Sequence, residues 1–320
     1  MNKIDFKLKI NLPNFTLRSE SNFSQGLNYI WGRSGQGKST LLNSISGFIK
    51  NCEGFINVND EIIFSSENKK SLPPEKRKIS YVQQNDLLFS NLNVYENLQF
   101  GYQFLNEKDK KITPNECASY FNIEELLNLY PNELSGGQKQ RVSLARAFSR
   151  NAGVVLLDEP INSLDAFSRK DILGKIEKIT NELNLCLLFV THYIEDIFEI
   201  SNDILLVENG TANKKINKKD IFNHWEEEDV LNQIVDNTEF EGKFFNSNSV
   251  MISKKKFDHT NHGFYFSGII DQIINNKNNS LLNIDCKKNY FISIDNKILN
   301  SLDLSKGSQV ECFVYKNLII

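Results

Sequence analysis

Eight residues near the N-terminus, Gly32-Arg33-Ser34-Gly35-Gln36-Gly37-Lys38-Ser39, decide which fold this chain is expected to adopt. They match the pattern GxxxxGK[ST], in which glycines let backbone N–H groups curl around phosphate oxygens. An apolar run, Leu27–Trp31, precedes them, and a helical pattern that includes Leu41 and Ile45 follows. This strand–loop–helix order is the context that a phosphate-binding loop requires, and a chance glycine-rich turn would lack it. We therefore predict that residues 32–40, including Thr40, bind nucleotide phosphates.

Two residues of this loop have chemical roles of their own. Lys38 is expected to reach the β- and γ-phosphates, and the hydroxyl of Ser39 is expected to hold Mg²⁺. The helix that begins here adds a positive partial charge at its N-terminus, which favours a bound anion. ATP with Mg²⁺ is therefore the expected ligand.

A second apolar run, Val154–Leu157, ends in two carboxylates, Asp158 and Glu159. Asp158 is expected to help hold Mg²⁺, and Glu159 to polarise the attacking water as a general base. Two acids after an apolar run are, by themselves, equally compatible with an ordinary exit from a strand into a loop. Their combination with the phosphate loop favours the catalytic interpretation.

The segment Leu134-Ser135-Gly136-Gly137-Gln138 lies between these two motifs in the chain. Ser135 and Gly137 open a helical pattern, so the segment is a second helix N-terminus that can receive an anion. By itself it is equally well explained as a helix cap. With a phosphate loop upstream and a strand ending in Asp-Glu downstream, however, the order of the motifs resembles that of ABC ATPases.

The resemblance implies a head-to-tail dimer of two copies. Each ATP then lies between the phosphate loop of one copy and Ser135, Gly136, Gly137 and Gln138 of the other. The resemblance also gives roles to three further residues. Gln84 touches Mg²⁺ or the attacking water, Asp165 lies in the loop that crosses between subunits, and His192 contacts the γ-phosphate and supports Glu159. The aromatic residue that stacks on adenine stays open between Phe15 and Phe6.

The chain of 320 residues suggests about two domains. Short apolar runs alternate with helical patterns up to residue 210, which predicts an α/β layered domain with a parallel sheet. We place this P-loop NTPase domain at 1–235, with a helical insertion at about 85–150. Residues 236–320 show alternating apolar and polar positions, such as Leu282 with Ile284, and predict a small antiparallel β domain.

The C-terminal segment resembles the small β domain of molybdate-type importers. Where the oxyanion-binding version of that domain opens with a serine-arginine-asparagine segment, this chain has Phe266-Ser267-Gly268-Ile269. We therefore expect the same kind of barrel-like fold but not its oxyanion site. Contact between the two copies of the dimer is the expected role.

Other segments resemble one branch of the ABC importers, which handles oxyanions, iron, sugars and polyamines. Leu72–Arg77, Ile79–Val82 and Asn97–Tyr102 are similar to the ATPases of molybdate importers. The resemblance implies an ATP-hydrolysing importer subunit for molybdate or a related oxyanion. Ferric iron, sulfate or another solute remains an alternative cargo, and a non-transport ABC ATPase is a third hypothesis.

Charge and composition limit the partners. The net charge of −3 gives no sign of nucleic-acid binding. No stretch approaches the roughly 20 apolar residues that a membrane span needs. We therefore expect separate transmembrane permease subunits, an indirectly linked substrate-binding protein, and a peripheral location on the cytoplasmic face of the cell membrane. The five cysteines lie far apart, without a CxxC pair, so neither zinc nor a disulfide framework is expected.

Overall fold

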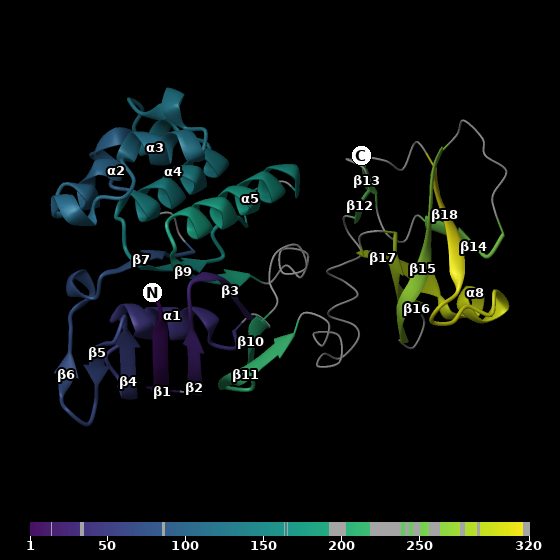
Figure 1. Ribbon diagram of the computed structural model, residues 1–320, viewed down its shortest axis with the longest axis horizontal. Helices are drawn as coiled ribbons and strands as arrows, with labels where there is room; N and C mark the ends of the chain where they lie inside the picture. Colours follow the sequence, from purple (N-terminus) through teal and green to yellow (C-terminus); the bar gives the residue numbers. More distant parts are fainter. Residues whose placement is uncertain are drawn as a thin grey trace. The chain divides into compact units, whose positions relative to one another are not determined.

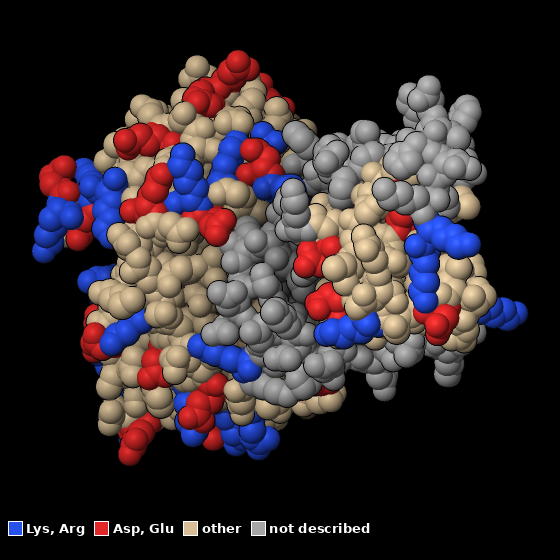
Figure 2. Space-filling model, turned by 45° about the vertical axis from the view of Figure 1, so that its right-hand side comes forward, with Lys and Arg blue, Asp and Glu red and all other residues tan. Residues whose placement is uncertain are grey.

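The computed structural model describes residues 1–13, 15–32, 35–84, 87–162, 164, 166–191, 203–217, 238–240, 243–245, 250–255, 263–275, 279–286 and 289–315. The chain separates into two compact units, Met1–Lys218 and Lys219–Ile320. The predicted boundary at 235/236 lies outside the described residues and stays a prediction. Figure 2 shows basic and acidic side chains interspersed on the visible face, as the small net charge suggests.

The described part of the first unit contains a mixed sheet with the strand order β6-β5-β4-β1-β2-β11-β10-β3-β9-β8-β7. Its parallel half consists of β3 (Gly26–Trp31), β7 (Ile79–Val82), β8 (Val154–Asp158), β9 (Cys186–Thr191) and β10 (Asp203–Glu208). Because both faces of these strands are covered, their sequences are almost continuously apolar. The two apolar runs quoted above, Leu27–Trp31 and Val154–Leu157, lie in β3 and β8.

The other half of this sheet is antiparallel except where β11 pairs with β2 in parallel, and it is an addition to the sequence-based expectation. It contains β1 (Ile4–Leu12), β2 (Phe15–Phe23), β4 (Cys52–Val58), β5 (Glu61–Ser65), β6 (Lys70–Ser71) and β11 (Thr211–Asn217). In β1 the buried Ile4, Phe6 and Leu8 alternate with more exposed, charged residues. That period of two is the signal of a half-buried strand, and it is visible in the sequence.

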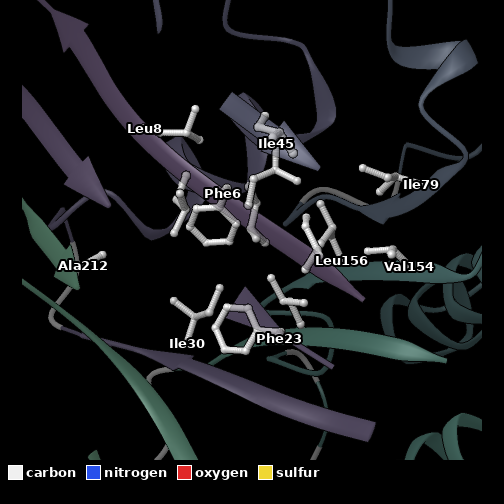
Figure 3. Close-up of a cluster of buried hydrophobic side chains, with 14 of the residues drawn as sticks. Phe6, Leu8, Phe23, Ile30, Ile45, Ile79, Val154, Leu156 and Ala212 are labelled. Atoms are coloured by element: carbon white, nitrogen blue, oxygen red, sulfur yellow. The ribbon is translucent and has the colours of Figure 1, made fainter. Parts of the chain in front are cut away.

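Helix α1 (Lys38–Ser46) lies between the two halves of this sheet (Figure 1). Its Leu41, Leu42 and Ile45 belong to one buried cluster with residues from both halves, among them Phe6 and Leu156 (Figure 3). The phosphate loop therefore leads from the central strand β3 directly into the hydrophobic core. This packing fixes the start of α1 relative to the ends of β3 and β8.

A helical group packs on the other side of the parallel strands (Figure 1). It contains α2 (Val94–Tyr102), α3 (Pro114–Tyr120) and α4 (Gly136–Ser149), with α5 (Ala166–Glu182) beside them. Three short 3-10 turns connect α2, α3 and α4: η2 (Glu107–Asp109), η3 (Glu124–Leu126) and η4 (Pro131–Glu133). A fourth, η1 (Pro74–Lys76), lies between β6 and β7. Side-chain capping boxes begin both α2, with Asn93 and Glu96, and α3, with Thr113 and Glu116. These caps fix the residues at which α2 and α3 begin within the helical insertion.

The second unit contains a five-stranded antiparallel sheet with the order β14-β18-β15-β16-β17. Its elements are β14 (Val250–Ser253), β15 (Gly263–Asn275), β16 (Asn279–Asp285), β17 (Asn289–Asp295), α8 (Asn296–Ser301) and β18 (Gln309–Tyr315). A separate pair joins β12 (Thr238–Phe240) to β13 (Lys243–Phe245). Ile284, Ile292 and Val314 share a core with Leu299 of α8. The expected small antiparallel β domain is therefore present.

Candidate nucleotide-binding site

The backbone of the phosphate loop depends on glycine at three positions. Gly35 and Gly37 have φ angles of 79° and 103°, in the left-handed region that other residues rarely adopt. At Gly32, a Cβ atom would lie 2.3 Å from the carbonyl oxygen of Val207 on β10. Gly37 also provides the carbonyl that accepts the N–H of Leu41, which starts the hydrogen bonding of α1. At Gly35 and Gly37, the loop therefore presents backbone without a side chain.

Lys38 is held under this loop with only 5% of its surface exposed. Its Nζ donates to the carbonyl oxygen of Gly32 at 2.6 Å. Burial lowers the pKa of Lys38, while the nearby carboxylates of Glu159 and Asp158 act in the opposite direction. A cation that has lost most of its water in this way gains strongly from a bound anion such as a phosphate.

Asp158 ends β8 and is 2% exposed. Its Oδ2 accepts the hydroxyl of Tyr81 at 3.3 Å, and it also forms a hydrogen bond with the side chain of Ser39. Desolvation by burial is the main cause that raises the pKa of Asp158, with the charge of Glu159 adding to it. The second oxygen, Oδ1, is buried and has no hydrogen-bond partner among the described residues.

These observations fit a magnesium ion. A buried carboxylate oxygen without a partner is costly, and Mg²⁺ prefers carboxylate and hydroxyl oxygens of the kind that Asp158 and Ser39 bring together here. The metal site predicted at Ser39, Gln84 and Asp158 stays a prediction, and the oxygens of Ser39 and Asp158 suit it chemically.

Glu159 follows directly and adopts a φ of 51°, which is uncommon for a residue with a side chain. Its N–H donates to the carbonyl of Val190 at 3.0 Å, so the turn after β8 is attached to β9. Two side-chain amides donate to its Oε2: Nε2 of Gln84 at 3.2 Å and Nδ2 of Asn162 at 2.5 Å. The structure thus brings the predicted base together with Gln84, which comes from the end of β7.

The Ser135–Gln138 segment caps its own helix, α4. The hydroxyl of Ser135 accepts the N–H of Gln138 at 3.3 Å, and Oε1 of Gln138 accepts the N–H of Ser135 at 2.8 Å. Ser135 and Gly136 are exposed, and Gly137 lies close to Leu164. A helix start whose first residues face solvent is open to a ligand presented by another molecule.

The remaining predicted residues divide into two groups. Gln36 accepts the N–H of Asn209 at 2.8 Å, which connects the loop to the end of β10, and Thr40 lies in the first turn of α1. Four residues lie outside the described part of the chain: Arg33, Ser34, Asp165 and His192. Their roles stay predictions.

The two aromatic candidates for adenine stacking differ sharply in their surroundings. Phe6 is fully buried in the core between the sheet halves, so it offers no face to a ligand. Phe15 is half-buried, and its ring lies 3.0 Å from the position that a Cβ on Gly37 would occupy. Of the two, only Phe15 borders the phosphate loop.

Two contacts of the site were not predicted from sequence. Tyr81 donates to Asp158 across neighbouring strands, and Asn162 donates to Glu159 from three residues downstream. Tyr81 occupies an alternating position of a strand, and Asn162 lies between recognised motifs. A hydroxyl or amide close in sequence to a predicted base is the one signal that could have indicated Asn162.

A groove of about 370 Å³ opens beside the site, between the parallel strands and the helical group. Its lining includes Phe48, Tyr81, Leu87 and Phe89, together with Arg146 and Arg150. Phe48 and Leu87 are more than half exposed, which is unusual for large apolar side chains. Tyr81 thus lines this groove while its hydroxyl contacts Asp158.

Comparison with known proteins identifies the family of the first unit. Residues 21–162 match the family model described as ABC transporter. The chain carries an ABC transporter domain. The matched range contains the phosphate loop, the Ser135–Gln138 segment and the Asp158-Glu159 pair, as the order of motifs predicted.

Curated relatives of this ABC domain are named as molybdenum import ATP-binding protein ModC. The protein of Haemophilus influenzae is 35% identical over 216 residues, which are 66% of this chain and 60% of that protein. The protein of Aliivibrio fischeri is 38% identical over 191 residues, covering 59% and 51% respectively. The chain thus matches about half to three fifths of the length of these relatives.

Solved structures confirm the fold of the ABC domain. An ATP-binding subunit of an ABC transporter superposes with a TM-score of 0.59 at 21% identity, covering 69% of this chain and 92% of that one. A dimeric ATP-binding cassette in a post-hydrolysis state, bound to ADP and phosphate, gives 0.56 at 25% identity, covering 68% and 99%. In the described part of this chain, no helix has both the length and the apolar character needed to cross a membrane.

Proposed function

We propose that this protein binds and hydrolyses ATP as the energy-coupling subunit of an ABC importer. The observation that carries the proposal is the meeting of three charged groups at the ends of β3 and β8. Lys38 and Asp158 are buried there with shifted pKa values, and Glu159 stands next to them in a left-handed conformation. Such a cluster, with a glycine-rich phosphate loop, suits phosphoryl transfer to water.

In this mechanism the protein supplies position and charge. Lys38 and the N–H groups of the loop hold the phosphates, and Phe15 stacks on the adenine. Ser39, Asp158 and Gln84 would hold Mg²⁺, and the ion would supply positive charge beside the phosphate oxygens. Glu159 accepts a proton from water as the water oxygen bonds to the γ-phosphorus and the bond to ADP breaks.

A second copy of the chain completes each site. Ser135–Gln138 of the partner copy supplies the helix N-terminus that faces the γ-phosphate. By resemblance to ABC ATPases, Asp165 lies in the loop that crosses between the copies, and His192 contacts the γ-phosphate. Exposure of Ser135 and Gly136 and the dimeric neighbour bound to ADP and phosphate support this arrangement. ATP then acts as a ligand that binds the closed dimer more tightly than the open one.

The groove beside Tyr81 suits a helix from a membrane-embedded permease subunit. Its exposed Phe48, Leu87 and Phe89 provide apolar surface, and Arg146 lies over the ring of Phe89 at 5.3 Å. Docking at this groove would hold the protein at the cytoplasmic face of the cell membrane. The permease in turn receives solute from a substrate-binding protein.

Molybdate or a related oxyanion is the proposed cargo, because the curated relatives are named for molybdenum import. Ferric iron or sulfate would require the same ATPase chemistry, so the site does not separate them. The test is the ATPase rate of the assembled transporter with its binding protein, comparing molybdate, tungstate, sulfate and ferric iron. Stimulation by molybdate and tungstate is expected, and stimulation by ferric iron alone would contradict the choice.

The hydrolytic role is tested by Glu159→Gln in the full chain. Because only the base is lost, we expect hydrolysis to fall by about 10²- to 10⁴-fold, the usual contribution of general-base catalysis. ATP binding and ATP-driven dimerisation should persist, which size-exclusion chromatography can measure. A variant that turns over ATP at the wild-type rate would show that Glu159 is not the base.

A further inference from the structure

Asn162 contacts the predicted base more closely than any motif residue described above. Its Nδ2 donates to Oε2 of Glu159 at 2.5 Å, whereas Nε2 of Gln84 reaches the same oxygen at 3.2 Å. A carboxylate can only accept hydrogen bonds, so the amide nitrogen, and not the amide oxygen, faces it. Hydrogen bonds to an ionised acceptor are the short and strong ones.

The turn that carries Asn162 is held on both sides of this residue. Ile161 is 1% exposed and Leu164 is 9% exposed, so both neighbours are anchored in the core. The N–H of Leu164 donates to the carbonyl of Ile161 at 3.2 Å. The side chain of Leu164 also packs close to Gly137 at the start of α4. Asn162 therefore lies between two buried residues, Ile161 and Leu164, that a backbone hydrogen bond joins.

Glu159 needs such support because of its own backbone. Its φ of 51° is a sparsely populated conformation that surrounding contacts must maintain. The bond from its N–H to Val190 fixes the main chain, and this leaves the direction of the carboxylate to side-chain contacts. Reacting atoms must be aligned closely for efficient catalysis, so the direction of the carboxylate matters for the rate.

We propose that Asn162 is a positioning residue that orients Glu159 for proton abstraction from the attacking water. The inference rests on the proposed role of Glu159 as the general base. By holding Oε2, Asn162 sets the plane of the carboxylate and directs Oε1 toward the water. Asn162 neither gains nor loses a proton: the water proton passes to Glu159 while the water oxygen bonds to the γ-phosphorus and ADP leaves.

The test compares Asn162→Ala with Asn162→Asp in the full chain, by kcat and KM for ATP with Mg²⁺. Loss of one hydrogen bond to a charged group predicts a fall in kcat of about tenfold for Asn162→Ala, with KM unchanged within about twofold. Asn162→Asp keeps the size of the side chain but places a negative charge against Glu159. We expect it to lose about 100-fold, because like charges disfavour the ionised base.

A merely structural role predicts the opposite order, since Asp replaces Asn almost without change of shape. Asn300→Asp, at an exposed position of α8, serves as the matched control and should leave kcat at the wild-type value. ATP binding measured in EDTA reports whether each variant is folded, without hydrolysis.

The wild-type and Glu159→Gln rates, measured in the same series, separate this inference from the proposed function. If the wild type hydrolyses ATP, Glu159→Gln does not, and Asn162→Ala keeps the wild-type kcat, the positioning role is wrong and the proposed function stands. A higher kcat for Asn162→Asp than for Asn162→Ala would also contradict the positioning role and leave the proposed function standing. If Glu159→Gln hydrolyses ATP normally, the base assignment fails and the inference fails with it.

Discussion

The two units of this protein place their buried polar side chains differently. In Met1–Lys218, Lys38 and Asp158 are almost fully buried at the ends of parallel strands, and an oxygen of Asp158 has no hydrogen-bond partner among the described residues. In Lys219–Ile320, the core cluster is apolar, with residues such as Ile284, and the buried Asn283 and Glu311 lie within strands β16 and β18 and not at strand ends. A buried charge costs free energy that a ligand can return, whereas an apolar core stabilises the fold by itself.

The topology of the sheets explains why the difference arises. Parallel strands bring their carboxyl ends to one edge, so residues distant in sequence, such as Lys38, Gln84 and Glu159, meet there. The antiparallel sheet of the second unit alternates strand directions, so its strands do not bring their carboxyl ends to one edge. We therefore expect the ATP chemistry in the first unit, and the contact role of the second unit stays a prediction.

The largest expected effect is on stability, in the second unit. Ile284→Ala removes a fully buried side chain from its core and should lower the free energy of unfolding of this unit by about 2–5 kcal/mol. Chemical denaturation with a probe in residues 219–320 measures this loss. Ile298→Ala, which changes an exposed side chain on α8, is the control. If Ile284→Ala also lowered ATP affinity, the claim that the second unit is separate from the nucleotide site would be wrong.

The next effect is on binding, in the first unit. Lys38→Ala removes the buried cation and should weaken ATP affinity by about 10- to 100-fold, the contribution of a hydrogen bond to a charged group. Titration with a fluorescent ATP analogue measures the affinity. Lys306→Ala, in the other unit, should have no effect. Equal losses from both lysines would mean that the phosphate loop is not the anion site.

The smallest effect sharpens the comparison, because the ligand is expected to reduce it. The raised pKa of Asp158 means that the folded chain holds this proton more tightly than the unfolded chain does. Stability therefore falls as pH rises from the ordinary value of 3.8 through the raised one, and the ionised group remains a cost at pH 7. Asp158→Asn removes that charge.

Without nucleotide, Asp158→Asn should raise Tm by about 2–4 °C, which corresponds to about 1 kcal/mol in a unit of this size. With ATP and Mg²⁺, the variant should gain less stabilisation than the wild type, because the metal loses a ligand. Thermal melts with and without the ligand measure both effects. A lower Tm in the absence of nucleotide would show that Asp158 is not destabilising there.

The motifs of this chain predicted much of the first unit because each one combines a strand with the loop that follows it. Glycine spacing and apolar runs located β3, β8 and the start of α1, and the geometry then placed Lys38 beside Asp158. The antiparallel strands β1 and β2 were not predicted, because their apolar residues alternate with polar ones and form no continuous apolar run. Asn162 was missed because its role depends on a turn conformation that no spacing encodes.

The adenine contact shows a similar limit. Phe6 and Phe15 differ little in sequence context, and only the packing of β1 and β2 places one in the core and the other beside Gly37. The predictions at Asp165 and His192 lie outside the described residues and rest on resemblance alone. What sequence cannot supply in these cases is the three-dimensional neighbourhood of a single side chain.

The claim that each ATP site is shared between two copies is tested most directly by mixing two defective chains. Ser135→Arg blocks the segment offered to the partner, and Lys38→Ala disables the chain's own phosphate loop. Each variant alone should hydrolyse little ATP, and a mixture should recover hydrolysis, because one intact site can form between the unlike copies. Hydrolysis by Ser135→Arg alone at the wild-type rate would contradict the shared site.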